Sequence, residues 1–546
     1  MIEDLREFQR DTTVTADICL IGAGAAGITI AKELAGSSLQ VCLVEGGGQQ
    51  YEYQESQELY RGDNIGVPVS LDGGRLRFFG GTTNHWGGRC AQLDDVDFRR
   101  RDWIPHSGWP IDRAELDPYY ARAYKIAGFS SEWRSDAGTL SYLNVALPPL
   151  NTEWLRPFLW HFTPAMKDAP VWKWANAYGP ILRESSNIRA ILHANFTAFS
   201  TEADRSRVRS VTVKSQNGVS ATISAKTFVL CCGGIENARL LLLAAEQNSG
   251  GFGNENDLVG RYFMQHPRGP AGLIVSAERM SRVQEQFNIL RGADDLEIEI
   301  GLSLTPQMME KERLLNCSAV LQYQGDPESG VTAAQDIWRA LLTGRWAPDM
   351  GEKVGLIAGD FGAFANGLKH RLSSGRSLVL EGSAGIPSRS AIVLLDLEQA
   401  PNPESRISLA QDRDALGLRR VTANWQLGEL ERRTAARFIG YIAAEFARLG
   451  IGRCRIEPWL QDDRIPVTDA LKETYHYIGT TRMADDPRQG VVDRNCVVHG
   501  MENLYVAGSS VFPTAGHANP TLTVVALALR LADRIRRQPR PGAAAS

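Results

Sequence analysis

The sequence has few cysteines, and their spacing indicates neither a metal site nor a disulfide framework. Eight cysteines occur in 546 residues, and they form no CxxC pair and no Cys/His pattern of the kind that binds zinc. Cys231 and Cys232 are adjacent within an apolar run, which indicates buried thiols. This sparse use of cysteine predicts a protein without a metal in a reducing compartment.

The chain also has no excess of positive charge and no long apolar run. Its 59 Lys and Arg against 63 Asp and Glu give a net charge of −4, so we do not expect nucleic acid as a partner. No stretch approaches the roughly 18 apolar residues that a membrane span requires. The first residues are charged, unlike a signal peptide. These features predict a soluble, cytoplasmic protein.

An ordinary globular composition accompanies these absences. Hydrophobic residues make up 43% and charged residues 22% of the chain, which excludes a disordered or fibrous protein. At roughly 150 residues per domain, the length predicts more than one domain.

A complete βαβ unit with three spaced glycines begins the chain. A short apolar run at 18–21 and another at 41–44 flank an alanine-rich segment, and Gly22, Gly24 and Gly27 follow the first run. This G-x-G-x-x-G pattern is typical of dinucleotide binding. The first glycine permits a tight turn, the second lets the backbone approach a pyrophosphate, and the third lets helix and strand pack closely.

The acidic residue that ends the second strand adds to this pattern. Glu45 is placed to accept a hydrogen bond from a ribose 2′-hydroxyl and would repel a 2′-phosphate. The motif itself fits both NAD and FAD.

Three later segments are glycine-rich or resemble further parts of the same sheet. Residues 73–90 contain a loop that would bring backbone close to a flat ring. Residues 228–242 and 504–510 each indicate a buried strand followed by a turn, and the first of them continues into a helix. The cofactor domain is therefore predicted to be discontinuous.

The segment between about 267 and 470 has a different pattern. Residues 296–304 and 406–409 alternate apolar with polar or small residues, which indicates antiparallel strands. Residues 391–397 indicate a buried strand, and apolar residues recur at helical spacing over 428–449. We interpret this segment as a substrate domain.

Taken together and in order, these motifs resemble those of the glucose–methanol–choline (GMC) family of FAD-dependent oxidoreductases. The segments that carry the resemblance are the N-terminal βαβ unit, Gly80–Trp86, Gly233–Arg239, Gly260–Pro267 and Tyr475–Asp533. Asn237-Ala238 replaces the commoner Thr-Pro of the family, which places the chain nearer its pyranose oxidase and bacterial sugar or polyol dehydrogenase branch.

The resemblance implies an α/β fold with two domains. The first is a Rossmann-like FAD-binding domain, a parallel sheet with helices, and the second is a substrate domain built on an antiparallel sheet backed by helices. We assign the FAD-binding domain to 1–115, 180–266 and 475–546, and the substrate-binding domain to 116–179 and 267–474.

The resemblance also implies a catalytic pair. His476 lies in the segment that carries the family's catalytic histidine, and Asn519 holds the position of its second catalytic residue. A neutral imidazole suits removal of a hydroxyl proton near pH 7, while hydride passes to flavin N5. Asn519 also suits an N-cap and Pro520 the first position of a helix that extends to Ile535. His517 is expected to line the site.

Cofactor contacts follow from the same resemblance, and FAD is expected to be held without a covalent bond. His85 is expected beside the dimethylbenzene ring, and a bond through it to the flavin 8α-methyl group, as in pyranose oxidases, is the alternative. The predicted cofactor-binding residues are Gly22, Gly24, Gly27, Glu45, Gly80, Gly81, Thr82, Thr83, Asn84, His85, Phe196 (in a strand Ile188–Phe199), Gly508, Ser509, Pro520 and Thr521.

The predicted reaction is oxidation of an alcohol group on a sugar, glycoside or polyol. Seven of the twelve tryptophans lie between Trp103 and Trp174, where they could stack on sugar rings or pack a subdomain. An aromatic or aliphatic alcohol and a flavin-dependent lyase or decarboxylase reaction are alternatives, as are an NAD-dependent dehydrogenase and a non-catalytic flavin-binding protein. The electron acceptor (O2, a quinone or an electron-transfer protein) and the oligomeric state stay open.

Overall fold

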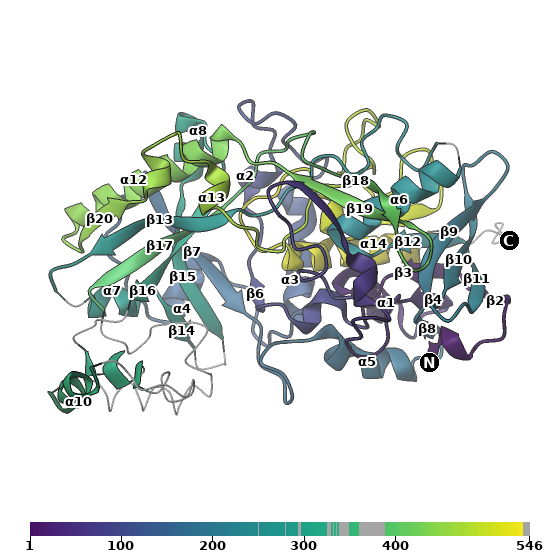
Figure 1. Ribbon diagram of the computed structural model, residues 1–546, viewed down its shortest axis with the longest axis horizontal. Coiled ribbons are helices and arrows are strands. Elements are labelled where there is room, and N and C mark those ends of the chain that lie inside the picture. The colour runs from purple at the N-terminus through teal and green to yellow at the C-terminus, as the bar shows by residue number, and fades with distance from the viewer. Residues whose placement is uncertain are drawn as a thin grey trace.

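The computed structural model describes residues 1–248, 250–278, 280–292, 296–324, 329–330, 332–334, 336–337, 349–359 and 388–538. Figure 1 shows two halves, one containing a parallel sheet with α1, α6 and α14, and the other a large antiparallel sheet with α12. The fold is thus mixed α/β, as predicted, with one parallel sheet and antiparallel sheets.

The parallel sheet takes its strands from the beginning, middle and end of the chain. In the described residues its order is β1 (Ile2–Asp4), β8 (Ile188–Leu192), β4 (Val41–Val44), β3 (Ile18–Ile21), β12 (Thr227–Leu230) and β21 (Leu504–Val506). Every residue of β3, β4 and β12 is buried, as expected for parallel strands with helices on both faces. The carboxyl ends of β3, β4 and β12 therefore meet at one edge.

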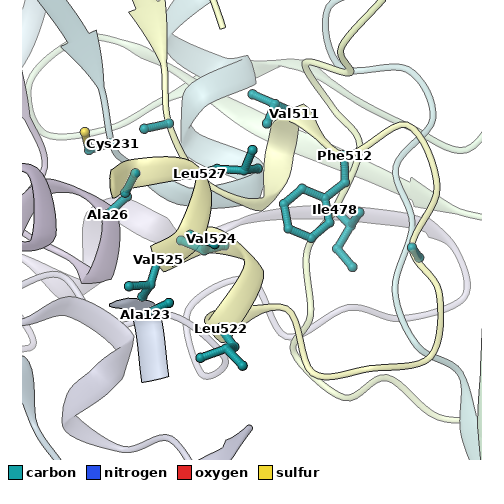
Figure 2. Packing of buried hydrophobic residues seen from close by; sticks show 14 of the residues in the cluster. Ala26, Ala123, Cys231, Ile478, Val511, Phe512, Leu522, Val524, Val525 and Leu527 are labelled. Carbon is teal, nitrogen blue, oxygen red and sulfur yellow. The ribbon is translucent and has the colours of Figure 1, made fainter. Parts of the chain in front are cut away.

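Helices from distant parts of the chain cover this sheet. They are α1 (Ala25–Leu34), α3 (Arg113–Ile126), α5 (Trp174–Glu184), α6 (Gly233–Gln247) and α14 (Thr521–Arg537). Figure 2 shows Val525 and Leu527 of α14 packed near Ala26 of α1 and Ala123 of α3. Small residues at these contacts let the helices approach closely, which fixes the start of α14 near the sheet edge.

The antiparallel sheet forms the core of the other half. Its order is β20 (Arg453–Ile456), β13 (Arg268–Val275), β17 (Ser390–Leu397), β16 (Cys317–Gln324), β15 (Glu297–Leu304), β7 (Leu155–Phe162) and β6 (Arg89–Cys90), with β14 (Ile289–Arg291) paired to β15. The long helix α12 (Glu429–Arg448) packs on β13, β16 and β17. The strands predicted at 296–304 and 391–397 and the helix predicted at 428–449 are present here within one residue at their ends. The strand predicted at 406–409 extends to Arg413 and belongs to a smaller sheet.

Two smaller sheets and several short elements complete the described chain. One sheet runs β2 (Thr12–Thr15), β11 (Ser220–Ser224), β10 (Val208–Lys214) and β9 (Asn195–Thr201), and the other β18 (Arg406–Arg413), β19 (Arg419–Trp425) and β5 (Gly62–Gly66). The remaining helices are α2 (Asp95–Phe98), α4 (Asp136–Tyr142), α7 (Ser281–Gln286), α8 (Pro306–Glu312), α10 (Met350–Gly359) and α13 (Val467–Ala470), with 3-10 turns at Leu5–Glu7, Gln57–Tyr60, Gly81–Asn84, Pro458–Leu460 and Ser509–Val511.

One expected strand is divided in two. The segment predicted as a single strand, Ile188–Phe199, forms β8 in the parallel sheet and β9 in another sheet. The break falls at His193, whose backbone is left-handed with φ of 52°. A left-handed residue turns the chain, so one strand cannot continue through it.

Three other expectations bear on the whole chain. All eight cysteines are free thiols, and the described residues hold no group of three side chains suited to a metal ion. No helix in the described ranges has the length and apolar character needed to cross a bilayer. The division into segments 1–115, 180–266 and 475–546 against 116–179 and 267–474, and the cytoplasmic location, stay predictions.

Candidate active site

A large cavity opens where the carboxyl edge of the parallel sheet faces the antiparallel sheet. Its walls come from the ends of β3, β4 and β12, the loop over 74–89, the segment 473–477, and the start of α14. Strand ends at a sheet edge are where α/β proteins bind ligands. The cavity therefore lies where the sequence motifs predict the cofactor.

The three glycines of the βαβ turn have three different surroundings. Gly22 has φ of 105°, and a Cβ on it would lie 2.8 Å from the carbonyl oxygen of Cys231. A Cβ on Gly27 would lie 2.0 Å from the oxygen of Gly22, so this glycine is needed for close packing of α1 on β3. A Cβ on Gly24 would meet no atom within 4 Å, because Gly24 borders the cavity.

This turn forms a cradle that fits a pyrophosphate. Gly22 and Gly24 line the cavity, and α1 begins there with Gly24 as its N-cap. The unpaired amides at a helix N-terminus favour an anion, and the open space at Gly24 leaves room for it. Gly27 lies outside the cavity lining and acts through packing.

Glu45 lines the cavity at the end of β4, although its carboxylate is already engaged by the backbone. It accepts hydrogen bonds from the amides of Ala23 (2.8 Å) and Gly47 (3.0 Å), and the residue is 7% exposed. A carboxylate has about four lone-pair positions, so these two bonds leave capacity for a ribose hydroxyl.

The loop over 80–86 approaches the cavity from the opposite wall. Gly80 and Gly81 have φ of 98° and 53°, and the hydroxyl of Thr83 donates to the oxygen of Gly80 at 2.7 Å. The Asn84 amide donates to the oxygens of Phe79 and Gly81 at 3.0 Å, so it holds the loop together. Of the predicted residues here, Gly81, Thr82, Thr83 and His85 line the cavity, and Gly80 and Asn84 do not.

His85 borders the cavity as a neutral imidazole. Burial lowers its pKa, against a smaller opposing effect of a hydrogen bond with the backbone of Gly74. The remaining predicted cofactor residues also line the cavity: Phe196, Gly508, Ser509, Pro520 and Thr521.

His476 and Asn519 meet inside this cavity. Both line it, and Nδ2 of Asn519 lies 3.3 Å from Nε2 of His476. Asn519 was also expected to cap α14, and that expectation is wrong. The N-cap is Pro520, no side chain caps the helix, and the Asn519 amide is directed to His476.

The C-terminal part of the chain matches a known enzyme family. The GMC oxidoreductase family model matches residues 401–528, the part of the chain that contains both His476 and Asn519. The C-terminal part of the chain therefore carries the GMC oxidoreductase domain. GMC oxidoreductases are enzymes that oxidise CH–OH donors, and their cofactor is FAD.

Relatives and solved structures along nearly the whole chain agree with this placement. The chain is similar to the fructose dehydrogenase large subunit of Gluconobacter japonicus, 25% identical and covering 96% of this chain and 98% of that protein. It is similar to the 2-methyl-1,2-propanediol dehydrogenase of Mycolicibacterium austroafricanum, 24% identical over 96% and 95%. Formate oxidase of Aspergillus oryzae shares the fold at 16% identity, with a TM-score of 0.57 over 97% and 99% of the two chains.

Two residues beside His476 were not assigned to the site from the sequence. Nδ1 of His476 lies 2.9 Å from Nδ1 of His266 and 3.1 Å from the hydroxyl of Thr474. Burial lowers the pKa of His476 well below its usual value, and the neighbouring His266 lowers it further. His266 belongs to the Gly260–Pro267 motif, so its position in that motif was the available signal.

Two charge pairs in the antiparallel sheet also reach the cavity of the enzyme. Arg268 on β13 and Arg89 on β6 line it. Arg268 donates to both carboxylate oxygens of Asp396, at 2.6 and 2.8 Å, and Arg89 pairs with Glu299. Sequence reasoning missed them because they lie on four strands that are far apart along the chain.

His517 does not line the cavity as expected, and the tryptophans take the packing role, one of the two roles considered for them. His517 is 2% exposed, is not part of the cavity lining, and has Nε2 3.7 Å from the Asp94 carboxylate. None of the tryptophans between Trp103 and Trp174 lines the cavity, and Trp160 and Trp174 are fully buried. They pack the core, and the cavity's tryptophan is Trp86.

Proposed function

We propose that this GMC oxidoreductase oxidises a secondary or primary alcohol group of a sugar, glycoside or polyol, with His476 as the base. The observation that carries the proposal is the contact between His476 and Asn519 in the wall of the cavity that also holds the pyrophosphate cradle. A base and an amide donor side by side can bind one hydroxyl oxygen, one taking its proton and the other orienting it.

His476 is suited to take the hydroxyl proton at neutral pH. Its lowered pKa leaves the imidazole neutral before substrate binds. The substrate O–H proton passes to Nε2, the carbinol C–H bond breaks with loss of hydride, and a carbonyl product remains. When bound, FAD supplies the acceptor for that hydride. Asn519 donates its amide hydrogen to the substrate oxygen while the proton leaves and negative charge develops there.

The antiparallel sheet forms one wall of the cavity, called the roof here, which Arg268 and Arg89 line. The charge pairs in this roof support a neutral, hydroxyl-rich substrate. Arg268 with Asp396 and Arg89 with Glu299 are balanced pairs, so the roof has hydrogen-bond donors and acceptors without net charge. Both arginines lie near His476, close enough to lower its pKa. The names of the relatives from Gluconobacter and Mycolicibacterium, which describe a sugar and a diol, agree with such a substrate.

His85 is proposed to pack beside the flavin's dimethylbenzene ring without a covalent bond. The lowered pKa keeps its imidazole neutral against an apolar ring edge. Gly22, Gly24 and Glu45 would hold the pyrophosphate and ribose, and Phe196 would contact the adenine.

An anaerobic panel of sugars, glycosides, polyols and aryl or alkyl alcohols tests the function. We expect the visible flavin band to bleach with a polyhydroxylated substrate, without assuming any electron acceptor. Bleaching only by aryl or simple aliphatic alcohols would support the alternative substrate class. Turnover of a substrate with no bleaching and no redox change would indicate a lyase or decarboxylase on the same scaffold.

A further inference from the structure

The imidazole of His476 has a second partner on the side away from the cavity. His266, which is 1% exposed, places Nδ1 at 2.9 Å from Nδ1 of His476. Its other nitrogen, Nε2, lies 3.3 Å from the carbonyl oxygen of Ala515. Two nitrogens facing each other can bond only when one carries a proton and the other a lone pair. These contacts form a row of hydrogen bonds from Ala515 through His266 to His476. The proton positions in this row can therefore be assigned from its two ends.

The contact with Ala515 determines which ring nitrogen of His266 carries the proton. Burial lowers the pKa of His266 to about 4, so at neutral pH the ring carries a single proton. A carbonyl oxygen only accepts hydrogen bonds, so that proton belongs on Nε2. Nδ1 of His266 then has a lone pair, and the bond to His476 requires a proton on Nδ1 of His476.

Thr474 leads to the same assignment by a separate path. Its hydroxyl donates to the backbone oxygen of His266 at 2.9 Å, which uses the only hydrogen on that oxygen. The same hydroxyl lies 3.1 Å from Nδ1 of His476 and can only accept there. A proton on Nδ1 of His476 satisfies both contacts.

The contact at the cavity end of this row of hydrogen bonds supports the same proton assignment. Nδ2 of Asn519 is a donor and faces Nε2 of His476 at 3.3 Å. With the proton on Nδ1, Nε2 has a lone pair for this donor and, in turn, for a substrate hydroxyl. The opposite tautomer would set a donor against a donor at Asn519 and an acceptor against an acceptor at Ala515.

We propose that His266 is a positioning residue that holds the His476 proton on Nδ1 and so keeps Nε2 available as the base. This inference rests on the proposed role of His476. After Nε2 takes the substrate proton, His476 is an imidazolium, and its Nδ1–H remains bonded to the neutral lone pair of His266. No electron moves in this step, and the proton stays on His476 until product leaves.

The charged and titratable groups around the pair lie on the antiparallel sheet, directly after β17, and in the segment before α14. Arg268, Arg89 and Asp396 act on His476. Asp396, His517 and Glu398 act on His266. Because these groups remain in place in variants of His266, a shift in the pH profile of such a variant reports on the bond between the two histidines.

The direct test is the tautomer of His476 in the FAD-loaded enzyme, read by ¹⁵N NMR after selective labelling of histidine. We expect the His476 signals, assigned by their absence in His476→Gln, to show a protonated Nδ1 and an unprotonated Nε2. In His266→Ala we expect a mixture of tautomers. A protonated Nε2 in the wild-type enzyme would overturn the inference, even if His476 were still the base.

Kinetic measurements distinguish a role of His266 in positioning His476 from a role in packing alone. We expect His266→Ala to slow flavin reduction by about 10- to 100-fold, as is common for partners of a functional histidine. The acid limb of the pH profile should move, because His476 loses both the acceptor of its Nδ1–H and the neighbouring imidazole that acts on its pKa. His266→Asn, which replaces Nδ1 with an amide oxygen, should recover most of the rate and the profile. A slower His266→Ala with an unmoved acid limb would mean that His266 only fills space.

A matched control is His161→Ala. His161, on β7, is also 1% exposed, and burial lowers its pKa to about 4. Its Nδ1 bonds to the hydroxyl of Tyr124 on α3 rather than to His476. This variant should lower thermal stability and leave the acid limb in place. Thr474→Val, which removes the second acceptor and keeps the shape, should shift the limb less than His266→Ala. If His266→Ala fails to fold, His266→Asn and the wild-type spectrum still decide the question.

Discussion

The two walls of the active-site cavity are built by different means. The cofactor wall consists of backbone: glycines at strand ends, helix N-termini and turns whose groups are set by local chain geometry. The substrate wall consists of side chains: His476, Arg268 and Arg89 line it from separate segments, and partners behind it, such as His266, position them by hydrogen bonds and charge. A backbone-built wall tolerates changes in side chains away from its glycines, whereas a side-chain-built wall depends on each partner. The predictions below test this difference.

The largest expected effect is on the substrate wall. His476→Ala should slow flavin reduction by roughly 10²–10⁴-fold, because the base is lost. FAD content should stay at about one per chain, since His476 belongs to the other wall. Rapid-mixing absorbance under anaerobic conditions measures the rate. Reduction at a near-normal rate would place the base elsewhere.

Substitution of the glycines in the cofactor wall should affect stability or FAD binding according to the surroundings of each glycine. Gly27→Ala should destabilise the fold, because its Cβ would lie 2.0 Å from the oxygen of Gly22. Gly24→Ala should leave the thermal stability of the apoprotein unchanged and weaken FAD binding at least about tenfold, or about 1.4 kcal/mol, because its Cβ enters the cavity. Equal behaviour of the two variants in FAD titration and thermal unfolding would contradict this assignment.

Arg268→Gln should break the charge pair in the roof. Burial alone would raise the pKa of Asp396, and Arg268 instead holds it well below its usual range. Loss of this partner should cost about 1–3 kcal/mol of stability at pH 7, moderated by the partial exposure of Arg268. KM for a polyol should rise as well.

The pH dependence of this variant has a defined sign. A depressed carboxyl pKa stabilises the folded state above the unfolded pKa, and that contribution is lost as the pH falls through about 4 and below. The wild-type advantage over Arg268→Gln in chemical denaturation should therefore be full at neutral pH and shrink in acid. A constant difference across that range would show that the pair contributes no charge-dependent stability.

Asn519→Ala should have a smaller effect that is confined to chemistry. We expect flavin reduction to slow by about tenfold, the loss of one hydrogen bond of about 1 kcal/mol. Thermal stability should be unchanged, because Asn519 makes no capping bond to α14. A clear fall in melting temperature would mean that the side chain does cap the helix in solution.

The smallest expected effect is at His85. Acid precipitation should release the yellow colour into the supernatant, and His85→Ala should retain FAD with at most a modest loss of affinity. Colour that stays in the wild-type pellet and is lost in His85→Ala would show a covalent bond.

The same contrast between the walls explains what could be predicted from the sequence. Gly22, Gly24 and Gly27 act through local backbone geometry, so their spacing alone predicts the turn and the space around it. The Arg268–Asp396 pair forms only when β13 and β17 align, which no local pattern encodes. Such partners become visible only in the folded chain.

Local rules also failed where two roles competed for one residue. Asn519 precedes Pro520 and has the side chain of a good N-cap, yet its amide is used by His476. The strand expected through His193 ends there because the backbone turns left-handed. At Asn519 the contact with His476 overrides a capping propensity that is worth about 1 kcal/mol.

The order of strands in the parallel sheet has a consequence for biosynthesis. β3, which begins the cofactor turn, leaves the ribosome early, whereas β21 and α14 are made last. Until they arrive, β12 is an unpaired sheet edge and α1 and α3 lack the helix that packs between them. An unpaired edge is prone to aggregate, so nascent chains should need chaperone protection until residues 504–537 are released. Cofactor loading should then follow synthesis of α14, and a chain that stops before residue 504 should be insoluble.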